Sequence, residues 1–321
     1  MSNEARAKEH LVEIDETSAS QVLEAEIGQP ITSLNWFKKG YYSRAALVEV
    51  KDGHKVVARF GIDPLGYQKD RYAAKHFASL RVPIPEIKTI KQLENNIWLC
   101  TSEYVEGVNS DELHGEQARA AIPSVQETLV ALHSTQVDST TGYGEFDENG
   151  RGSHSSWAAY LSDDFCSEEF YQDVAVDADL IKQAWAKIGE LAKLCPTERF
   201  LVHEDFGSDN LLIKDGKVVA VLDWHSAVIG DWAMDVARCE KYPREVYGDL
   251  RAAHEQAGFD SSNWEARINC YRLRSQIGLV NWIWDRKIKG LKSWQDLKGA
   301  QNDLRSGLEQ VKAGLVDGES S

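Results

Sequence analysis

The hydrophobic pattern of the first hundred residues is that of short strands separated by turns. Four apolar-rich runs are bounded by turn residues, namely residues 44–50, 55–60, 87–91 and 97–104. Asp52 and Gly53 join the first two runs, and this pair predicts a hairpin because both residues tolerate the positive φ of a tight turn. The turn at residues 94–96 joins the other two runs. The pattern therefore predicts a small antiparallel sheet.

One helix is inserted into this predicted sheet. Within residues 68–80 a helical spacing relates five positions, namely Tyr72, Ala73, His76, Phe77 and Leu80. Pro83 and Pro85 follow shortly afterwards. Because a proline disfavours helical backbone in the residue before it, we expect the helix to stop ahead of these prolines.

Beyond residue 107 the pattern becomes mostly helical. Helices are predicted near residues 112–134, 180–195, 232–241, 244–258, 262–285 and 294–314. One hairpin interrupts them, with strands at residues 210–213 and 217–222 around Asp215 and Gly216. The second part of the chain is thus expected to be a helical unit that carries a single hairpin.

This change of pattern divides the chain into two lobes. A chain of 321 residues is at the upper limit for one domain. We place the boundary near residue 105, between an N-terminal lobe of residues 1–105 and a C-terminal lobe of residues 106–321. The predicted fold class is α+β, with a small antiparallel-sheet lobe and a larger, mostly helical lobe. A cleft between two lobes is a usual place for a ligand.

Composition places the chain among soluble globular proteins. Hydrophobic residues make up 42% and charged residues 27% of the chain. The first ten residues are polar, unlike a secretory signal, and no apolar run has the roughly 20 residues that span a bilayer. The five cysteines are widely spaced and lack a C-x-x-C pair, which indicates free thiols in a reducing compartment. We expect a cytoplasmic protein.

The net charge of −15 is unevenly distributed along the chain. Residues 1–105 hold 14 acidic and 14 basic side chains, whereas residues 106–321 hold 37 acidic and 22 basic ones and so carry the whole excess. An acidic surface repels nucleic acids and anionic membranes and attracts cations. The sequence therefore predicts no nucleic-acid or membrane partner. A cationic partner of the second lobe is one interpretation of the charge, and solubility alone is the other.

Candidate chemistry gathers around the predicted hairpin of the second lobe. Asp205 follows the apolar run 200–202, Asn210 comes five residues later, and Asp223 ends the returning strand. A hairpin brings Asn210 and Asp223 to the same end, and two such oxygen ligands suit Mg²⁺, which usually keeps only one or two carboxylates. The spacing H-x-D-x4-N, which His203 begins, is typical of phosphotransfer enzymes with a kinase-like fold.

The letters of Asp205, Phe206 and Gly207 also spell D-F-G. That tripeptide binds metal in protein kinases, but there it follows the H-x-D-x4-N motif. By order and spacing, its counterpart in this chain is Asp223-Trp224, without the glycine. Asp205 is therefore expected to face the acceptor hydroxyl, and Asp223 to face the metal.

These motifs make the chain resemble the aminoglycoside phosphotransferase family. The resemblance is carried by residues 66–72, 76–79, 83–86, 201–210, 220–224 and 230–231, and it extends more weakly from about residue 30 to residue 285. It implies a bilobal protein-kinase-like fold, with the N-terminal lobe binding nucleotide and the C-terminal lobe binding the acceptor.

The family pattern implies a role for each residue of the catalytic motif. Asp205 would be the catalytic base, and Asn210 and Asp223 would bind magnesium. His203 and Asp231 would brace the catalytic loop. His203 acting as a general base is the alternative for that residue.

The resemblance also implies a nucleotide site in the first lobe. Arg59 takes the place of the strand lysine that reaches the phosphates, and Asp70 that of its helical carboxylate partner; an ordinary surface ion pair is the alternative. A loop with a single glycine would meet the β-phosphate through backbone amides, unless it is a plain turn. Its residues include Gly40, Tyr42 and Ser43. The connection between the lobes would meet adenine or serve as a linker strand, and comprises Ser102, Glu103, Tyr104 and Val105.

Acceptor-binding residues are expected in the acidic lobe. Residues 152–181 contain seven acidic side chains and no Lys or Arg. They line the acceptor cleft or form a solvated face. The candidates for contact with the acceptor are Glu204, Asp209, Asp163, Asp164, Trp282 and Asp285. Large aromatic side chains such as Trp282 also occur in helical cores.

The resemblance leads to an expected reaction. A monomeric enzyme would use ATP, or GTP, with Mg²⁺ to phosphorylate a hydroxyl of an aminoglycoside, with hygromycin B as the first candidate, and so confer resistance. The alternatives are a kinase of another hydroxylated molecule, such as an amino alcohol or a macrolide, and a catalytically silent nucleotide-binding protein. The intact trio of Asp205, Asn210 and Asp223 argues against the silent protein.

Overall fold

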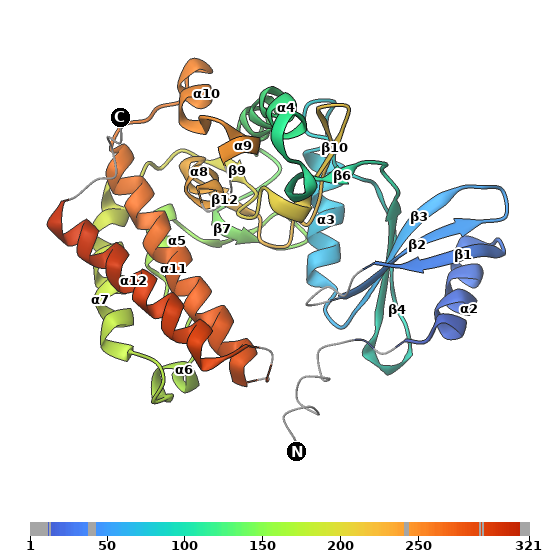
Figure 1. The fold of residues 1–321 in the computed structure, drawn as a ribbon, viewed down its shortest axis with the longest axis horizontal. Coiled ribbons are helices and arrows are strands. Elements are labelled where there is room, and N and C mark those ends of the chain that lie inside the picture. The colour runs from blue at the N-terminus through green and yellow to red at the C-terminus, as the bar shows by residue number, and fades with distance from the viewer. Residues whose placement is uncertain are drawn as a thin grey trace.

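The chain folds into two lobes that lie side by side (Figure 1). The structure is a computed structural model. It describes residue 12, residues 14–37, 43–240 and 244–288, residue 290 and residues 292–314. The smaller lobe is built on a single sheet, and the larger lobe is mostly helical, as the sequence predicts.

The smaller lobe is a five-stranded antiparallel sheet with strand order β1-β2-β3-β5-β4. The strands are β1 (Ile31–Trp36), β2 (Ser43–Val50), β3 (Lys55–Gly61), β4 (Ile87–Gln92) and β5 (Trp98–Glu103). Both predicted hairpins are present, and Gly53 has the positive φ that the first one requires. Arg59 is directly opposite Cys100 in the β3–β5 pair, so the sheet fixes where its side chain starts.

The N-terminal helix and β1 were not predicted from the sequence. Helix α2 (Glu16–Ile27) begins where the Asp15 carboxylate accepts the Ser18 amide, and it ends at Gly28 in the left-handed conformation. Its Ala19 and Leu23 are fully buried in the core of the small sheet. Figure 1 shows this helix beside the sheet of the smaller lobe.

Helix α3 (Leu65–His76) starts and ends earlier than the predicted range of 68–80. The Asp63 carboxylate accepts the Leu65 amide at 2.9 Å and so favours an earlier first turn. After the helix, Ser79 and Val82 close a turn with two hydrogen bonds, which leaves Leu80 fully exposed. Leu80 fits the helical spacing by coincidence, because it lies beyond the end of the helix.

Helix α3 packs into the core of the larger lobe and also contacts β4 of the small sheet. Tyr72, Ala73 and Phe77 belong to the hydrophobic core of that lobe and not to the core under the small sheet. Tyr72 donates to the Ser139 carbonyl at 2.7 Å and lies against Phe146. The boundary near residue 105 therefore describes the course of the chain, whereas α3 is seated on the lobe that follows it.

The larger lobe combines nine described helices with two small sheets. The helices are α4 (Gly115–His133), α5 (Trp157–Ser162), α6 (Glu168–Gln172), α7 (Ala178–Leu191), α8 (Ala233–Cys239), α9 (Arg244–Tyr247), α10 (Leu250–Gln256), α11 (Trp264–Ile288) and α12 (Trp294–Ala313). The strands are β6 (Val108–Asn109), β7 (Tyr143–Phe146), β8 (Gly152–His154), β9 (Phe200–Val202), β10 (Leu211–Lys214), β11 (Lys217–Val221) and β12 (Val228–Gly230). In Figure 1, α11 and α12 lie against each other on the side away from the smaller lobe.

The expectation of a single hairpin in this lobe was incomplete. Strands β10 and β11 form the predicted hairpin, but β6 adds a third strand, and a separate four-stranded sheet has the order β8-β7-β12-β9. These strands are only two to five residues long, which is too short for a clear alternation. The predicted helix 244–258 is also two helices, because Gly248 has a positive φ and Asp249 caps a new first turn.

No helix in the described ranges is both long enough and apolar enough to cross a membrane.

Candidate active site

The catalytic loop leaves β9 and carries Asp205 to the edge of the larger lobe. The Asp205 side chain is 37% exposed. Its carboxylate Oδ2 accepts a hydrogen bond from Asn210 Nδ2 at 2.9 Å, and Arg238 Nη2 is 3.4 Å from Oδ1. Asn210 Nδ2 also donates to the Asp205 carbonyl at 3.0 Å. Asn210 therefore fixes both the backbone and the carboxylate of Asp205.

The backbone of the catalytic loop is held by a buried carboxylate that sequence analysis missed. Asp235, in the first turn of α8, accepts the His203 amide at 2.8 Å and the Glu204 amide at 2.7 Å. Glu204 has a positive φ of 62°, and these bonds stabilise that unusual conformation. His203 itself contacts the Leu222 carbonyl through Nε2 at 3.0 Å, which joins the loop to the segment before Asp223.

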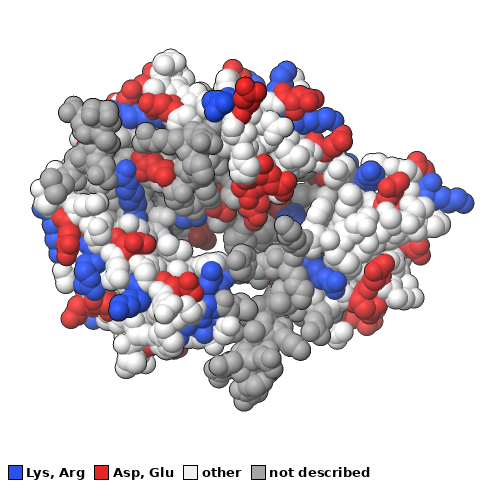
Figure 2. All heavy atoms as spheres, in the orientation of Figure 1, with Lys and Arg blue, Asp and Glu red and all other residues white. Residues whose placement is uncertain are grey.

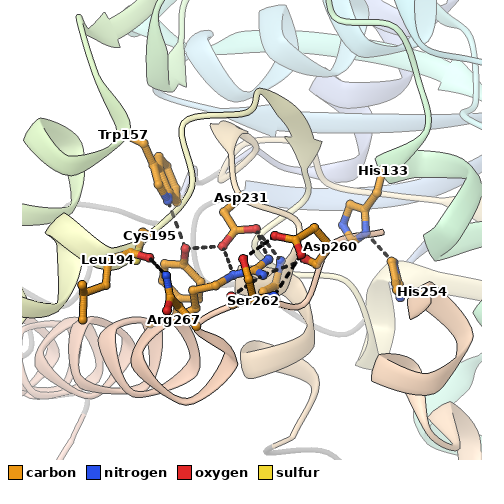
Figure 3. Close-up of polar contacts among 12 residues, drawn as sticks. His133, Trp157, Leu194, Cys195, Asp231, His254, Asp260, Ser262 and Arg267 are labelled. Carbon is orange, nitrogen blue, oxygen red and sulfur yellow. Dashed lines mark hydrogen bonds and ion pairs between the residues drawn. The ribbon is translucent and has the colours of Figure 1, made fainter. Parts of the chain in front are cut away.

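A chain of two buried histidines continues from Asp235. His133 Nε2 is 3.0 Å from Asp235 Oδ2, and His133 Nδ1 is 2.7 Å from His254 Nε2. The His254 Nδ1 atom lies 2.7 Å from the Leu250 carbonyl, so that nitrogen carries the proton. Figure 3 shows His133 and His254 pointing toward each other from α4 and α10. Burial lowers the pKa of His254 to about 3, and the neighbouring His133 adds to the effect.

The hairpin β10–β11 brings the two proposed metal ligands to one end, as the spacing predicts. Leu211 is opposite Val221, and the Leu222 amide donates to the Asn210 carbonyl at 2.8 Å. Asp223 follows directly, with a positive φ of 59°. Since Asn210 donates through Nδ2, its Oδ1 is the atom that could bind a metal ion together with the Asp223 carboxylate. Burial raises the pKa of Asp223 and the neighbouring Asp70 raises it further, whereas Arg59 opposes the shift.

One amide oxygen and one carboxylate form a donor set that fits Mg²⁺, which completes its shell with phosphate oxygens and water. The raised pKa of Asp223 fits the same interpretation, because a cation beside that carboxylate would favour its charged form. Across the described ranges, no group of three or more His, Cys, Asp or Glu side chains is arranged for a metal ion. The candidate metal site therefore rests on Asn210 and Asp223.

The predicted pair of Arg59 and Asp70 is present and connects three elements. Arg59 Nη2 is 2.6 Å from Asp70 Oδ2, and Asp70 Oδ1 accepts the Trp224 amide at 2.8 Å. Burial opposes the charge on Arg59, but the Asp70 carboxylate outweighs it, so the pKa of the guanidinium is raised. Asp70 is buried. This arrangement excludes an ordinary surface ion pair, because the carboxylate ties β3 to α3 and to the residue after Asp223.

The other proposed nucleotide residues lie along the sheet. Gly40 and Tyr42 are outside the described residues. Ser43 is the first residue of β2 and is opposite Gly61 in β3. Ser102 and Glu103 end β5, where the Glu103 amide donates to the Glu86 carbonyl at 2.9 Å. Tyr104 and Val105 then lead, partly exposed, into the larger lobe. This is where a connection between two lobes is expected.

The resemblance implies that Asp231 braces the catalytic loop. In the described structure, its carboxylate instead binds side chains of helix α11. Its two carboxylate oxygens accept Arg267 Nε at 2.8 Å and Nη2 at 2.7 Å, and Tyr271 donates to the same carboxylate. Figure 3 shows Arg267 reaching Asp231 from α11. Both Asp231 and Arg267 are buried. Asp231 thus anchors α11 beside β12, and Asp235, four residues later, holds the loop.

Two of the proposed acceptor residues flank Asp205. Glu204 is partly buried, and burial raises the pKa of its carboxyl, with Glu145 adding to the shift and Arg238 and Arg274 opposing it. Asp209 is exposed on the short turn before β10. Glu204 therefore lies between acidic and basic neighbours, whereas Asp209 faces solvent.

Several carboxylates of the acidic stretch 152–181 have partners within the protein. Asp164 accepts the Cys166 amide and the Tyr171 hydroxyl, and Asp173 accepts the indole of Trp284. Asp163 is 62% exposed and is 3.3 Å from His154. Structural roles therefore account for Asp164 and Asp173, and Asp163 is the more accessible of the proposed pair.

The late aromatic residues lie on α11. Trp282 is partly buried and the Arg286 guanidinium is 3.9 Å from its ring centre, while Asp285 is 3.7 Å from the same guanidinium. On the face drawn in Figure 2, acidic and basic side chains are interspersed over both lobes. The acidic side chains are thus not confined to one patch of this face.

Comparison with known proteins places this site in a family. The model of the phosphotransferase enzyme family matches residues 34–267. Hygromycin-B 4-O-kinase of Escherichia coli is 31% identical over 228 residues, which are 70% of this chain and 66% of that relative. The residues that the family model matches contain the strand arginine, the catalytic loop, the hairpin and Asp231.

Solved structures agree with this match. A thermostable mutant of aminoglycoside phosphotransferase APH(4)-Ia, in a ternary complex with AMP-PNP and hygromycin B, superposes with a TM-score of 0.78 at 26% identity, over 92% of this chain and 99% of that one. A putative fructosamine-3-kinase from Thermobifida fusca shares the fold alone, with a TM-score of 0.65 at 16% identity over 92% of this chain and 100% of that one. The kinase-like fold predicted from the motifs is confirmed. The chain belongs to the phosphotransferase enzyme family and is an O-phosphotransferase.

Proposed function

We propose that this enzyme transfers the γ-phosphoryl group of ATP to a hydroxyl of an aminoglycoside, with hygromycin B as the first candidate. The observation that supports this most is the Asp205 carboxylate, which Asn210 orients at 2.9 Å beside the hairpin end that carries Asp223. The relative from Escherichia coli, whose printed name is hygromycin-B 4-O-kinase, supports the choice of acceptor.

In the proposed reaction, Asp205 orients the acceptor hydroxyl and takes its proton as the hydroxyl oxygen bonds to the γ-phosphorus and the bond from that phosphorus to the ADP oxygen breaks. Because Asn210 holds Oδ2, the other oxygen is directed toward Arg238 and the open edge of the loop. Asp235 keeps the loop backbone in place through its two amide bonds. Phosphoryl transfer depends mainly on positioning and charge stabilisation, and this loop is built for positioning.

Asn210 and Asp223 would hold magnesium, which supplies charge neutralisation for the phosphates when bound. Arg59 would contact phosphate oxygens from the opposite lobe, since its planar guanidinium can donate two parallel hydrogen bonds. Asp70 fixes that guanidinium at 2.6 Å and so limits its freedom before nucleotide binds. We further propose that the enzyme acts as a monomer in the cytoplasm, where ATP is available, and that GTP is a possible second donor.

The proposal is tested by ADP release in the presence of four acceptors: hygromycin B, a kanamycin-type drug, a macrolide and choline. We expect release with hygromycin B to exceed that with the macrolide and choline, because the second lobe has the acidic excess that a polycation requires. Release with choline or the macrolide alone would overturn the aminoglycoside assignment while leaving the phosphotransferase intact.

A further inference from the structure

Lys69 lies in a segment that the family resemblance singles out and to which no role has been given. It is on α3, and only 2% of its surface is exposed. A buried ammonium group is costly unless hydrogen bonds and nearby carboxylates compensate for the lost water. Lys69 Nζ donates to the Ala227 carbonyl at 2.9 Å and to the His225 carbonyl. It also faces the ring of Phe146, with its nitrogen 4.9 Å from the ring centre.

The two carbonyls belong to the segment that leaves Asp223. Residues 222–227 connect β11 to β12 without regular secondary structure. Among residues 222–227 themselves only two hydrogen bonds are described, one from the Ala227 amide to the Trp224 carbonyl and one from the His225 amide to the Asp223 carboxylate. The segment thus depends on outside contacts for its shape.

Helix α3 provides those contacts from one face. Lys69 binds the carbonyls of His225 and Ala227, and Asp70, the next residue, accepts the Trp224 amide at 2.8 Å. One turn earlier, Gly66 packs so closely that a β-carbon there would be 2.8 Å from the His225 ring nitrogen. Tyr72, Ala73 and Phe77 of α3 lie in the core of the larger lobe, so the helix that makes these contacts with residues 224–227 is itself anchored there.

We propose that Lys69 is a positioning residue for the phosphoryl transfer: by binding the carbonyls of His225 and Ala227, it holds the segment that presents the Asp223 carboxylate. Asp223 has a positive φ of 59°, which costs a non-glycine residue energy and persists only where its surroundings impose it. Burial lowers the pKa of Lys69, and the charges of Glu145, Glu204, Asp70 and Asp223 oppose that shift. The ammonium group of Lys69 therefore offsets the mutual repulsion of these carboxylates, and Arg59 also favours the charged form of Asp223.

The inference rests on the proposed metal role of Asp223, and its first test requires neither metal nor substrate. Hydrogen–deuterium exchange of the metal-free wild-type protein should show residues 224–227 protected, although they form no regular secondary structure. In Lys69→Met, which keeps the length of the side chain and removes the donors, we expect exchange there to be about tenfold faster, whereas the hairpin β10–β11 should not change. Lys75→Met, an exposed site on the same helix, is the matched control.

The second test measures Mn²⁺ binding by electron paramagnetic resonance with ADP present. We expect Lys69→Met to weaken Mn²⁺ binding about tenfold and to leave the KM of hygromycin B within twofold. Lys69→Gln, which keeps a donor on a shorter chain, should lie between wild type and Lys69→Met if the methionine variant is too unstable to purify. A folded variant with wild-type exchange at residues 224–227 and wild-type Mn²⁺ affinity would overturn the proposal. So would an unprotected segment in the wild type.

Asp223→Asn separates this inference from the proposed function. If Asp223→Asn leaves Mn²⁺ binding unchanged, the metal role of Asp223 is wrong, whatever Lys69 does. If Asp223→Asn weakens binding and neither Lys69 variant does, the metal role holds and the positioning role of Lys69 is wrong.

Discussion

At the scale of single residues, three side chains lie where the spacing in the sequence predicts. Asp205, Asn210 and Asp223 are joined by a short loop and one hairpin, so local geometry alone brings them together. The contribution of Asp235 was missed because it reaches the loop from 32 residues further along the chain. The sequence does offer two carboxylates for this role, Asp231 just after β12 and Asp235 in the first turn of α8. Tertiary contacts decide which of them binds the loop.

Asp205→Ala should lower turnover by about 10²–10⁴-fold, because no other group is held at that position to take the proton of the acceptor. Nucleotide binding should persist, since Arg59 and Asp70 are on other elements. Steady-state kinetics and a titration with ADP measure the two effects. Asp215→Ala, at the exposed tip of the hairpin, is the control. Turnover equal to that of the wild type would remove Asp205 from the mechanism.

Asp223→Asn should raise the magnesium concentration that gives half-maximal activity, because an amide is a weaker ligand than a carboxylate. The substitution keeps the shape of the side chain, and asparagine tolerates the positive φ at this site. Titrating Mg²⁺ at fixed ATP measures the shift. Asp215→Asn, also at a positive φ, is the matched control. Identical magnesium curves for Asp223→Asn and the wild type would contradict the ligand role.

At the scale of elements, long periodic helices and the turn-bounded hairpins were predictable, whereas short strands and helix ends were not. The hairpin pairs β2–β3, β4–β5 and β10–β11 formed as expected because their turns are local. The sheet of β7, β8, β9 and β12 joins segments far apart in the chain, and no local pattern encodes such pairing. The packing of α3 in the core of the larger lobe likewise depends on residues far along the chain, so no local pattern predicts it.

The ion pair between Asp231 and Arg267 determines how α11 is seated. Arg267→Met should destabilise the protein by about 3–5 kcal/mol, because the substitution leaves the buried Asp231 carboxylate without its charged partner. Thermal or urea unfolding measures the loss. Arg272→Met, on the same helix and partly exposed, should cost about 1 kcal/mol or less. Equal losses of unfolding free energy in Arg267→Met and Arg272→Met would show that burial adds nothing to the stabilisation by the Asp231–Arg267 pair.

The buried histidine chain predicts a loss of stability in acid. The pKa of His254 is about 3 in the folded protein, below its usual value near 6.5 when unfolded. Between those values the unfolded state binds more protons, so the contribution is complete above about pH 6.5 and is lost as the pH falls toward 3. Urea unfolding at pH 6 and pH 4 measures this loss. Between these pH values, the free energy of unfolding of the wild type should fall by up to about 1.4 kcal/mol per pH unit more than that of His254→Gln. If the free energies of unfolding of the wild type and His254→Gln fell equally with pH, the lowered pKa of His254 would be contradicted.

At the scale of the whole molecule, the uneven charge leads us to propose different ligands for the two lobes. The first lobe is neutral and the second carries the excess of −15. Raising salt should therefore raise the KM of hygromycin B more than that of ATP, because screening weakens attraction between a polycation and an acidic lobe. Kinetics across a series of NaCl concentrations test this. A drug KM that does not depend on salt would leave the excess as a solubility feature, consistent with the interspersed charges in Figure 2.

The proposed function depends most on Asp205 directing the transfer of a phosphoryl group to hygromycin B. Mass spectrometry of the antibiotic after incubation with the enzyme, ATP and Mg²⁺ tests it directly. The wild type should add the mass of one phosphoryl group, and Asp205→Ala should leave the drug unmodified over the same period. Unmodified hygromycin B with a folded wild-type enzyme that binds ATP, or equal modification by both proteins, would contradict the account.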